Sequence, residues 1–162
     1  MYKFLSENII SKINFNKTII LVQYGYTNGQ IITEVLEKMN DDSLLFVFET
    51  DNKKVTDLLQ LQDKRLRIYD ADAYSAKSIL EKQGYLGKVD CIISTVGFSF
   101  FDSRKTRRIV FKSYALLKEG GMLFTNKYSL LIYYTIKHRF IETKIKFKPI
   151  SFSLIFIIKG IK

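Results

Sequence analysis

The sequence predicts an α/β fold: a mostly parallel, seven-stranded sheet with helices on both faces and an antiparallel hairpin at the C-terminal end. Short apolar runs typical of strands alternate with longer segments of helical periodicity, which is the pattern of β-α-β units. Two further apolar runs end the chain on either side of a tight turn at Pro149, and strands joined so closely must be antiparallel.

The first strand is expected at 17–23, where the run is apolar on both faces, as in a central parallel strand. The helix after it, at 29–39, gathers its apolar residues on one side. Gly84 ends a later helix, and Gly120 and Gly121 end the longest one. The other parallel strands are expected at 43–49, 65–70, 88–95 and 122–126. The other helices are expected at 52–61, 73–84, 103–121 and 128–138.

The C-terminal hairpin has a specific predicted arrangement. Lys144, Lys146 and Lys148 alternate with apolar residues in its first strand. Lysines along a strand keep an exposed sheet edge from pairing with other molecules, so this strand is expected at the edge. The run 152–158 is almost wholly apolar, which places the last strand inside the sheet.

Length and composition indicate one domain over 1–162, with 1–16 as a short N-terminal helical arm. The chain has 162 residues, of which 47% are hydrophobic, enough for a core. A single cysteine, Cys91, excludes an intrachain disulfide and favours a reducing compartment. No apolar run approaches the roughly 18 residues of a membrane span, and the start lacks a secretory signal. We therefore expect a cytoplasmic protein.

The charge is the outlying property. Lys and Arg total 26 and Asp and Glu total 16, which gives a net charge of +10. Such a field attracts nucleic acid, anionic lipid heads or phosphorylated small molecules. A genome biased towards Lys, Ile and Asn codons would give the same composition, so the charge allows an anionic partner without requiring one.

Ligands of open α/β sheets bind outside the carboxyl ends of the strands. Gly25 ends the first strand and lets the backbone turn sharply, and Gly29 lets the next helix begin close to a ligand. N–H groups at a helix start favour a carboxylate or phosphate. This two-glycine turn alone is equally consistent with an ordinary strand–helix connection.

Two acids follow at the next two strand ends. Glu49 lies 20 residues after Gly29 (49 − 29) and can accept both hydroxyls of a ribose. Asp72 can accept from an exocyclic amine. Together with the turn, these acids fit an adenosine better than a bare phosphate. Taken singly, Glu49 could be a solvated loop acid and Asp72 a helix cap.

In the order and spacing of five motifs, the chain from about Lys17 onward resembles the Rossmann-like class I S-adenosylmethionine-dependent methyltransferases. It is most similar to their bacterial phospholipid N-methyltransferase branch, near the rRNA adenine dimethylases. "VQYGYTNGQIITEVL" resembles the glycine-rich loop and helix, "FVFET" the ribose-binding acid and "IYDADA" a Gly-Asp-Ala motif. "VDCIISTVGFSF" resembles the Ser-Gly-Leu-Pro-Phe loop, and "LLKEGGMLFTNKY" the Leu-Lys-Pro-Gly-Gly strand with a downstream tyrosine.

The resemblance implies S-adenosylmethionine as cofactor and in-line methyl transfer, which needs alignment and exclusion of water more than catalytic side chains. We identify no catalytic residue, and one His and one Cys cannot form a metal centre. The residues expected to bind the cofactor are Gln23, Tyr24, Gly25, Tyr26, Thr27, Gly29, Glu49, Thr50, Asp72, Ala73, Ser94 and Thr95.

The chain departs from the family pattern at the loop itself. Thr27 replaces the middle glycine, and Gln23 replaces an acid that helps to hold the methionine amino group. Exchanging a charged for a neutral hydrogen bond loses about 1 kcal/mol, or tenfold or less in affinity. Gly97 stands where proline is usual, and "STVGF" lacks the Asn or Asp that polarises an aminopurine, which disfavours adenine as the acceptor.

The candidates for substrate binding are Phe98, Arg104, Lys105, Arg107, Arg108 and Tyr128. Aromatic faces can stabilise the cation that forms on a methylated amine, although such residues are more often part of a core. The four cations of "SRKTRR" oppose a helix macrodipole at a cost of about 0.3–1 kcal/mol. An anionic partner would offset this cost, and a solvated basic face is the alternative.

The sequence thus predicts a methyltransferase that N-methylates an amine such as a phospholipid head group, with peripheral contact at the inner membrane face. An RNA methyltransferase is the alternative enzyme. The substitutions at 23, 27 and 97 also allow a methyltransferase-like protein whose activity is lost or depends on a partner.

Overall fold

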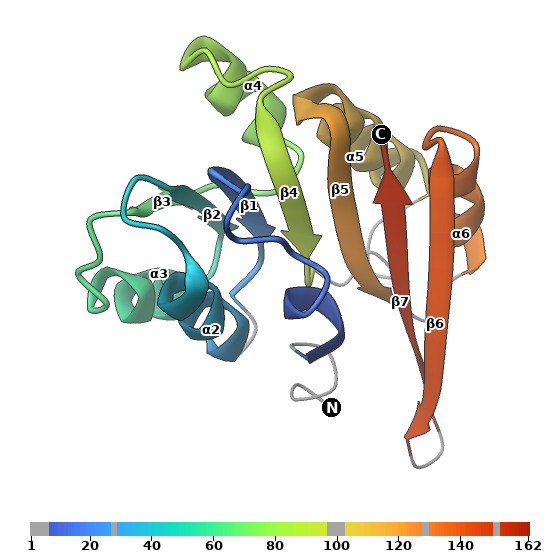
Figure 1. The fold of residues 1–162 in the computed structure, drawn as a ribbon, viewed down its shortest axis with the longest axis horizontal. Coiled ribbons are helices and arrows are strands. Elements are labelled where there is room, and N and C mark those ends of the chain that lie inside the picture. The colour runs from blue at the N-terminus through green and yellow to red at the C-terminus, as the bar shows by residue number, and fades with distance from the viewer. Residues whose placement is uncertain (1–6, 27–28, 97–102, 128–129, 151–152) are drawn as a thin grey trace.

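The computed structural model describes residues 7–26, 29–96, 103–127, 130–150 and 153–162. It contains a seven-stranded sheet in the order β3-β2-β1-β4-β5-β7-β6 (Figure 1). The strands are β1 (Ile20–Tyr24), β2 (Leu44–Glu49), β3 (Leu66–Asp70), β4 (Val89–Ser94), β5 (Leu117–Lys127), β6 (Glu142–Ile150) and β7 (Ser153–Ile161). The helices are α2 (Gln30–Lys38), α3 (Asn52–Leu59), α4 (Ala76–Lys82), α5 (Ser103–Leu116) and α6 (Leu130–Lys137).

The pairing of the strands confirms the predicted fold class. Strands β3, β2, β1, β4 and β5 pair in parallel, whereas β7 pairs antiparallel with both β5 and β6. The last strand is therefore inserted between β5 and β6, as its apolar sequence predicts. Strand β6 is outermost, as its lysines predict.

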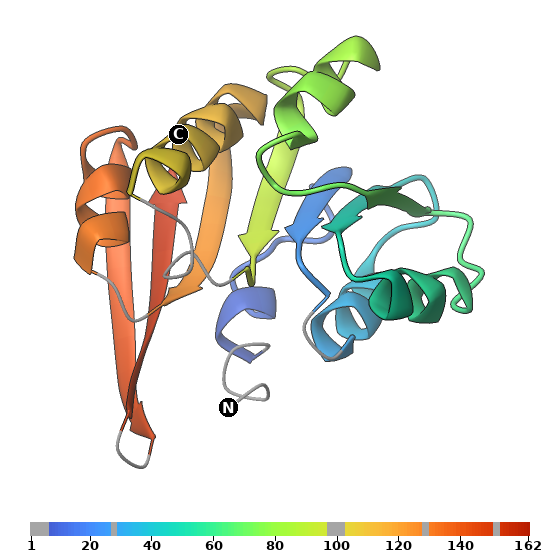
Figure 2. The ribbon, with the colours of Figure 1, turned by 180° about the vertical axis from the view of Figure 1, so that it is seen from behind.

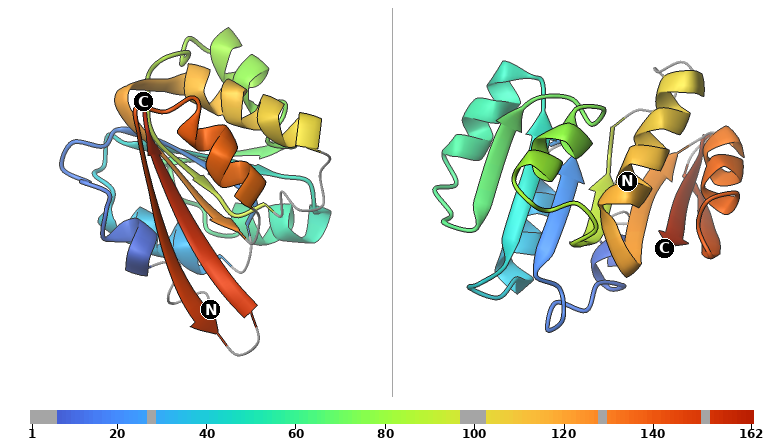
Figure 3. Two further views of the ribbon diagram at one scale, coloured as in Figure 1. Left: turned by 90° about the vertical axis from the view of Figure 1, so that its right-hand side faces the viewer. Right: turned by 90° about the horizontal axis from the view of Figure 1, so that it is seen from above.

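Helices cover both faces of the sheet (Figures 2 and 3). Alternate residues of β1 show why both faces are apolar: Leu21 packs against α2, α3 and the N-terminal arm, and Val22 faces α4, α5 and α6. Within the arm, residues 7–10 form one helical turn, and Ile9 and Ile13 are buried against the α2 side of the core. Residues 11–16 are not helical, so the helix in the described part of the arm ends at Ile10.

The longest helix ends earlier than predicted. Helix α5 stops at Leu116, and Gly120 and Gly121 belong to the irregular start of β5. The β4–β5 register shifts there, and the bulge brings Lys118 into an ion pair with the buried carboxylate of Asp90. Gly120 has a φ of 75°. The two glycines therefore serve a bulge in a strand rather than a helix end.

Pro149 was expected in the hairpin turn but lies within β6, opposite Leu154 of β7. Proline lacks a backbone N–H and is tolerated on an edge strand, whose outer side has no partner strand. Among the described residues, no helix combines the length and apolarity needed to cross a membrane.

Candidate functional site

The turn after β1 is fixed from both neighbouring strands. Gly25 has a φ of 82°, a conformation that glycine adopts without strain. Its N–H donates to the carbonyl of Phe48 in β2 at 2.9 Å. A Cβ at this position would lie 3.0 Å from Val96 Cγ1 and 3.2 Å from Thr95 Oγ1, both after β4. The chain can therefore turn here only because position 25 has no side chain.

Glu49 lies directly against this turn. Its Oε2 accepts from the N–H of Tyr26 at 2.7 Å, and its Oε1 accepts from the N–H groups of Thr50 and Asp51 at 2.8 and 3.0 Å. The residue is 9% exposed. Glu49 therefore joins the ends of β1 and β2 from a largely buried position.

Gln23 connects the turn to β4. Its side chain is buried, and its Nε2 donates to the Gly25 carbonyl at 2.9 Å and to Thr95 Oγ1 at 3.2 Å. The Thr95 hydroxyl oxygen lies 3.1 Å from the carbonyl oxygens of both Tyr24 and Gly25, to one of which it donates. A carboxylate at position 23 could not donate to the Gly25 carbonyl, so the family's acid would not serve here as the glutamine does.

The start of α2 is shaped by Tyr26. Gly29 has a φ of 79°, and a Cβ there would lie 2.5 Å from the Tyr26 hydroxyl and 2.9 Å from its ring carbon Cε2. Tyr26 itself is partly buried against the α2 side of the core. The absence of a side chain at Gly29 thus admits the tyrosine ring over the first turn of α2, a role that the glycine pattern alone does not reveal.

Asp72 is held by two partners. Its Oδ1 accepts from the N–H and the hydroxyl of Ser75 at 3.0 and 2.9 Å, which makes it the cap of the turn entering α4. Its Oδ2 lies 3.0 Å from Lys105 Nζ of α5. Burial alone would raise the pKa of Asp72, but the hydrogen bonds from Lys105 and Ser75 outweigh it and lower that pKa. The acid is therefore ionised and joins the sheet edge to α5.

The remaining predicted cofactor residues differ in accessibility. Tyr24 is buried beneath α5, where its hydroxyl contacts Ser113 Oγ at 3.2 Å, and burial raises its pKa to about 12. Ala73 and Ser94 are also buried, whereas Thr50 is exposed. Tyr24 and Ser94 are therefore enclosed within the protein, and only Thr50 of these residues is accessible.

Two buried hydroxyls on β4 and β5 have no hydrogen-bond partner among the residues that the structure describes. Ser94 Oγ and Thr125 Oγ1 belong to residues that lie opposite one another in the β4–β5 pairing. Thr125 is not evident from the sequence pattern, because its position beside Ser94 depends on the register of the two strands.

The basic start of α5 borders a cavity of about 440 Å³. Its described lining consists of Tyr74, Arg104, Lys105 and Arg108. Lys112 lies one turn further along α5, with Nζ 3.2 Å from the centre of the Tyr74 ring. Three of the predicted substrate cations are thereby brought together, while the Arg107 side chain bonds back to the Ser103 carbonyl at 3.4 Å.

Three predicted site residues, Thr27, Phe98 and Tyr128, lie outside the described residues, as does Gly97. Tyr74 was not among the predicted site residues. Its role at the cavity follows from its contact with Lys112 across 38 residues of sequence.

Comparison with solved structures finds the same architecture in methyltransferases. The S-adenosylmethionine-dependent O-methyltransferase of Thermotoga maritima is 15% identical, with a TM-score of 0.73 over 100% of this chain and 66% of that one. The N-methyltransferase NodS of Bradyrhizobium japonicum is 8% identical, with a TM-score of 0.75 over 99% and 95%. The chain has the class I methyltransferase fold.

A third structure, the precorrin-6y C5,15-methyltransferase of Geobacter metallireducens, is 13% identical, with a TM-score of 0.73 over 98% of this chain and 89% of that one. These class I methyltransferases act on different acceptors, as their names state, so the shared fold leaves the acceptor open. No protein-family model matches the sequence, and no curated protein matches it.

The residues at the strand ends fit the cofactor of the class I methyltransferases. A carboxylate has about four acceptor positions, and Glu49 uses three of them on backbone N–H groups. The remaining capacity is on Oε2, the oxygen that accepts from the Tyr26 N–H, and a ribose hydroxyl would donate there. At Asp72, an adenine amine would share the carboxylate with Lys105.

Proposed function

We propose that the protein is an S-adenosylmethionine-dependent methyltransferase that N-methylates an amine carried by an anionic molecule, such as a phospholipid head group. The observation that carries this proposal is the bond from the Tyr26 N–H to Glu49. It holds the acceptor for the cofactor's ribose directly beside the glycine turn, at the sheet edge where ligands of such folds bind.

The cavity at α5 supports an anionic substrate. It is lined by Arg104, Lys105 and Arg108. Lys105 Nζ also lies 3.0 Å from Asp72 Oδ2, so the cationic cavity borders the acid proposed to bind the adenine amine. A phosphate bound by the arginines would place a tethered amine towards the strand ends. The Tyr74 ring in the same cavity can stabilise the positive charge that the amine gains.

Binding of the cofactor is tested by titration calorimetry with S-adenosylmethionine and S-adenosylhomocysteine. We expect Glu49→Ala to weaken binding at least tenfold, because it removes the ribose acceptor. Glu119→Ala, at a carboxylate that is 82% exposed on β5, is the matched control and should change the affinity less than twofold. Circular dichroism of each variant establishes that it is folded.

Because Glu49 also holds three backbone N–H groups, Glu49→Gln provides a second comparison. The amide oxygen can still accept from Thr50 and Asp51, so this variant removes charge while keeping part of the turn. No heat from folded wild-type protein at millimolar ligand would discard both enzyme functions and leave the inactive alternative. Unchanged affinity in both Glu49 variants would mean that the cofactor binds elsewhere.

The acceptor is tested by transfer of a labelled methyl group to vesicles containing an aminophospholipid and, at matched salt, to total RNA. We expect label in the lipid, and expect Arg104→Gln with Arg108→Gln to raise KM several-fold. The control Lys53→Gln with Lys88→Gln removes the same charge from exposed positions outside the α5 cavity, and it should leave KM unchanged. Label in RNA alone would replace the lipid proposal with the RNA methyltransferase, which the net charge of +10 also favours.

A further inference from the structure

A second cationic cavity lies between the N-terminal arm and the C-terminal hairpin. It has a volume of about 310 Å³ and a described lining of Asn8, Lys12, Phe124, Lys144, Lys146 and Lys159. Figure 1 shows the arm between the central strands and the hairpin, which extends beyond the rest of the sheet. The residues of this cavity are separate from those that surround the α5 cavity.

The register of the strands explains why these lysines gather. Phe124 of β5 pairs with Lys159 of β7, which in turn pairs with Lys144 of β6, so the three side chains form one row across the sheet. Lys146 lies two residues further along β6 and therefore on the same face. Lys12 comes from the arm. Four ammonium groups from three separate segments thus border one hollow.

Among the described residues, the contacts of Lys144, Lys146 and Lys159 offset only part of this charge. Lys146 Nζ lies 3.5 Å from the neutral Oδ1 of Asn8, and Lys159 Nζ lies 5.9 Å from the centre of the Phe124 ring. Lys144 forms an ion pair with Glu142. The described lining itself contains no carboxylate. Ammonium groups placed together repel one another, and a multiply charged anion between them would relieve the repulsion.

Protection of the sheet edge accounts for part of this cluster only. Lys144 and Lys146 lie on the edge strand β6, where lysine discourages pairing with other chains. Lys159 lies on the inner strand β7, between β5 and β6, and Lys12 is outside the sheet. Neither of these two can protect an edge, so their convergence on the same hollow needs another reason.

We propose that this cavity is a binding site for a phosphate group on a small, multiply charged ligand such as a pyrophosphate or a phosphomonoester. The lysine ammonium is a compact point charge suited to phosphate oxygens. The hollow has the size of a small-ligand pocket, and the buried Phe124 side chain closes its floor. This proposal is independent of the methyltransferase function, because it uses none of the residues at the strand ends.

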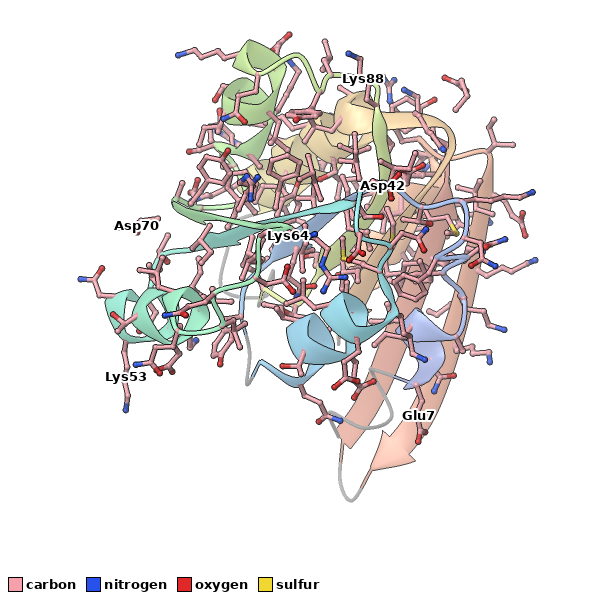
Figure 4. All side chains as sticks on the ribbon, turned by 60° about the vertical axis from the view of Figure 1, so that its left-hand side comes forward. Glu7, Asp42, Lys53, Lys64, Asp70 and Lys88 are labelled. Atoms are coloured by element: carbon pink, nitrogen blue, oxygen red, sulfur yellow. The ribbon has the colours of Figure 1, made fainter. Side chains whose placement is uncertain are left out.

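The test is calorimetric titration of the protein with pyrophosphate, without the methyl donor. We expect the triple variant Lys12→Gln, Lys144→Gln, Lys159→Gln to bind at least tenfold more weakly than wild type. The matched control, Lys53→Gln, Lys64→Gln, Lys88→Gln, removes the same charge from exposed positions elsewhere (Figure 4) and should weaken binding less than threefold. An equal loss in both triple variants, or no binding to wild type, would overturn the proposal.

Melting temperatures establish that both triple variants are folded. If the Lys12 triple variant is unfolded, the double variant Lys12→Gln with Lys146→Gln replaces it. Arg104→Gln with Arg108→Gln should leave pyrophosphate binding unchanged, and a loss there would assign the binding to the α5 cavity and overturn the proposal. Free glycerol phosphate and vesicles of phosphatidic acid then distinguish the source of the phosphate. If either probe binds wild type and only the Lys12 triple variant abolishes that binding, the result supports the site. If neither probe binds, the result counts against it.

Discussion

At the scale of single residues, Gln23 shows how a departure from a family pattern can have a structural role. Its amide donates to the Gly25 carbonyl and to Thr95 Oγ1, so the turn after β1 is tied to β4 by a neutral donor. The glutamine that stands in place of the family's acid therefore adds order to the turn. We therefore expect Gln23 to affect the stability of the loop as well as the affinity for the cofactor.

Restoring the acid at this position tests that role. We expect Gln23→Glu to lower the free energy of unfolding by about 2 kcal/mol or more, because it places a buried carboxylate against a carbonyl oxygen. Gln60→Glu, at an exposed position after α3, is the control and should change it by less than about 0.5 kcal/mol. Urea denaturation at pH 7 measures both. A Gln23→Glu protein as stable as wild type would show that the hydrogen bonds from Gln23 do not stabilise the turn.

The sequence allowed the position of Glu49 to be predicted but not its bonds. The spacing from Gly29 and the end of an apolar run place this acid beside the turn, and the structure has it there. That its oxygens accept three backbone N–H groups depends on the exact paths of two loops, which side-chain patterns do not encode. The Asp72–Lys105 pair was equally hidden, because it joins different elements across 33 residues (105 − 72).

At the scale of elements, the connection between α3 and β3 is held by Asp63 and Arg65. The guanidinium donates to both carboxylate oxygens, at 3.0 and 2.6 Å, and also to the Met39 carbonyl at 2.7 Å. The side chains are 19% and 15% exposed. The hydrogen bonds from Arg65 lower the pKa of Asp63 from 3.8 to about 2.

This lowered pKa predicts a pH-dependent contribution to stability. The ionised Asp63 stabilises the fold above its ordinary pKa of 3.8, and the contribution is lost as the pH falls towards about 2. Asp63→Asn should therefore lower the free energy of unfolding by about 1–2 kcal/mol at pH 7, and the difference from wild type should shrink between pH 4 and pH 2.5. Urea denaturation across this range measures it, and a difference independent of pH would contradict the ion pair.

The strands and helices of the parallel half followed from the alternation of apolar patterns, and two element boundaries did not. Gly120 and Gly121 resemble a helix end, but the bulge that they form depends on the pairing of β5 with β4. Pro149 resembles a turn residue, but a proline is equally acceptable in a strand that has no neighbour on one side. In both cases, the pairing of the strands determined which of two local structures the residue adopts.

At the scale of the whole molecule, the sheet ends in an exposed edge at β6, whose lysines oppose pairing between copies. We expect Lys144→Val with Lys146→Val to cause association or aggregation, measured by light scattering at rising protein concentration. Lys53→Val with Lys82→Val adds the same apolar surface on helices α3 and α4 rather than beside an edge strand, and it should leave the protein dispersed. Equal scattering from the two variants would show that hydrophobicity alone, rather than the edge, causes the effect.

The overall topology was the most predictable property, because seven apolar runs and one closely joined final pair leave few arrangements of the sheet. The cavity of the arm and hairpin was the least predictable. Lys12 and Lys159 are separated by most of the chain, and they meet only because β7 returns into the sheet beside β5. A pattern of alternating lysines in β6 indicated an edge but not a hollow.

Cys91 lies at the centre of β4 and is fully buried between β1 and β5. Burial raises the pKa of its thiol, so the reactive thiolate is both scarce and inaccessible in the native protein. An alkylating reagent can therefore reach this sulfur only when the middle of the sheet opens. The sole thiol of the sequence is a natural reporter of that opening, and it needs no engineered label.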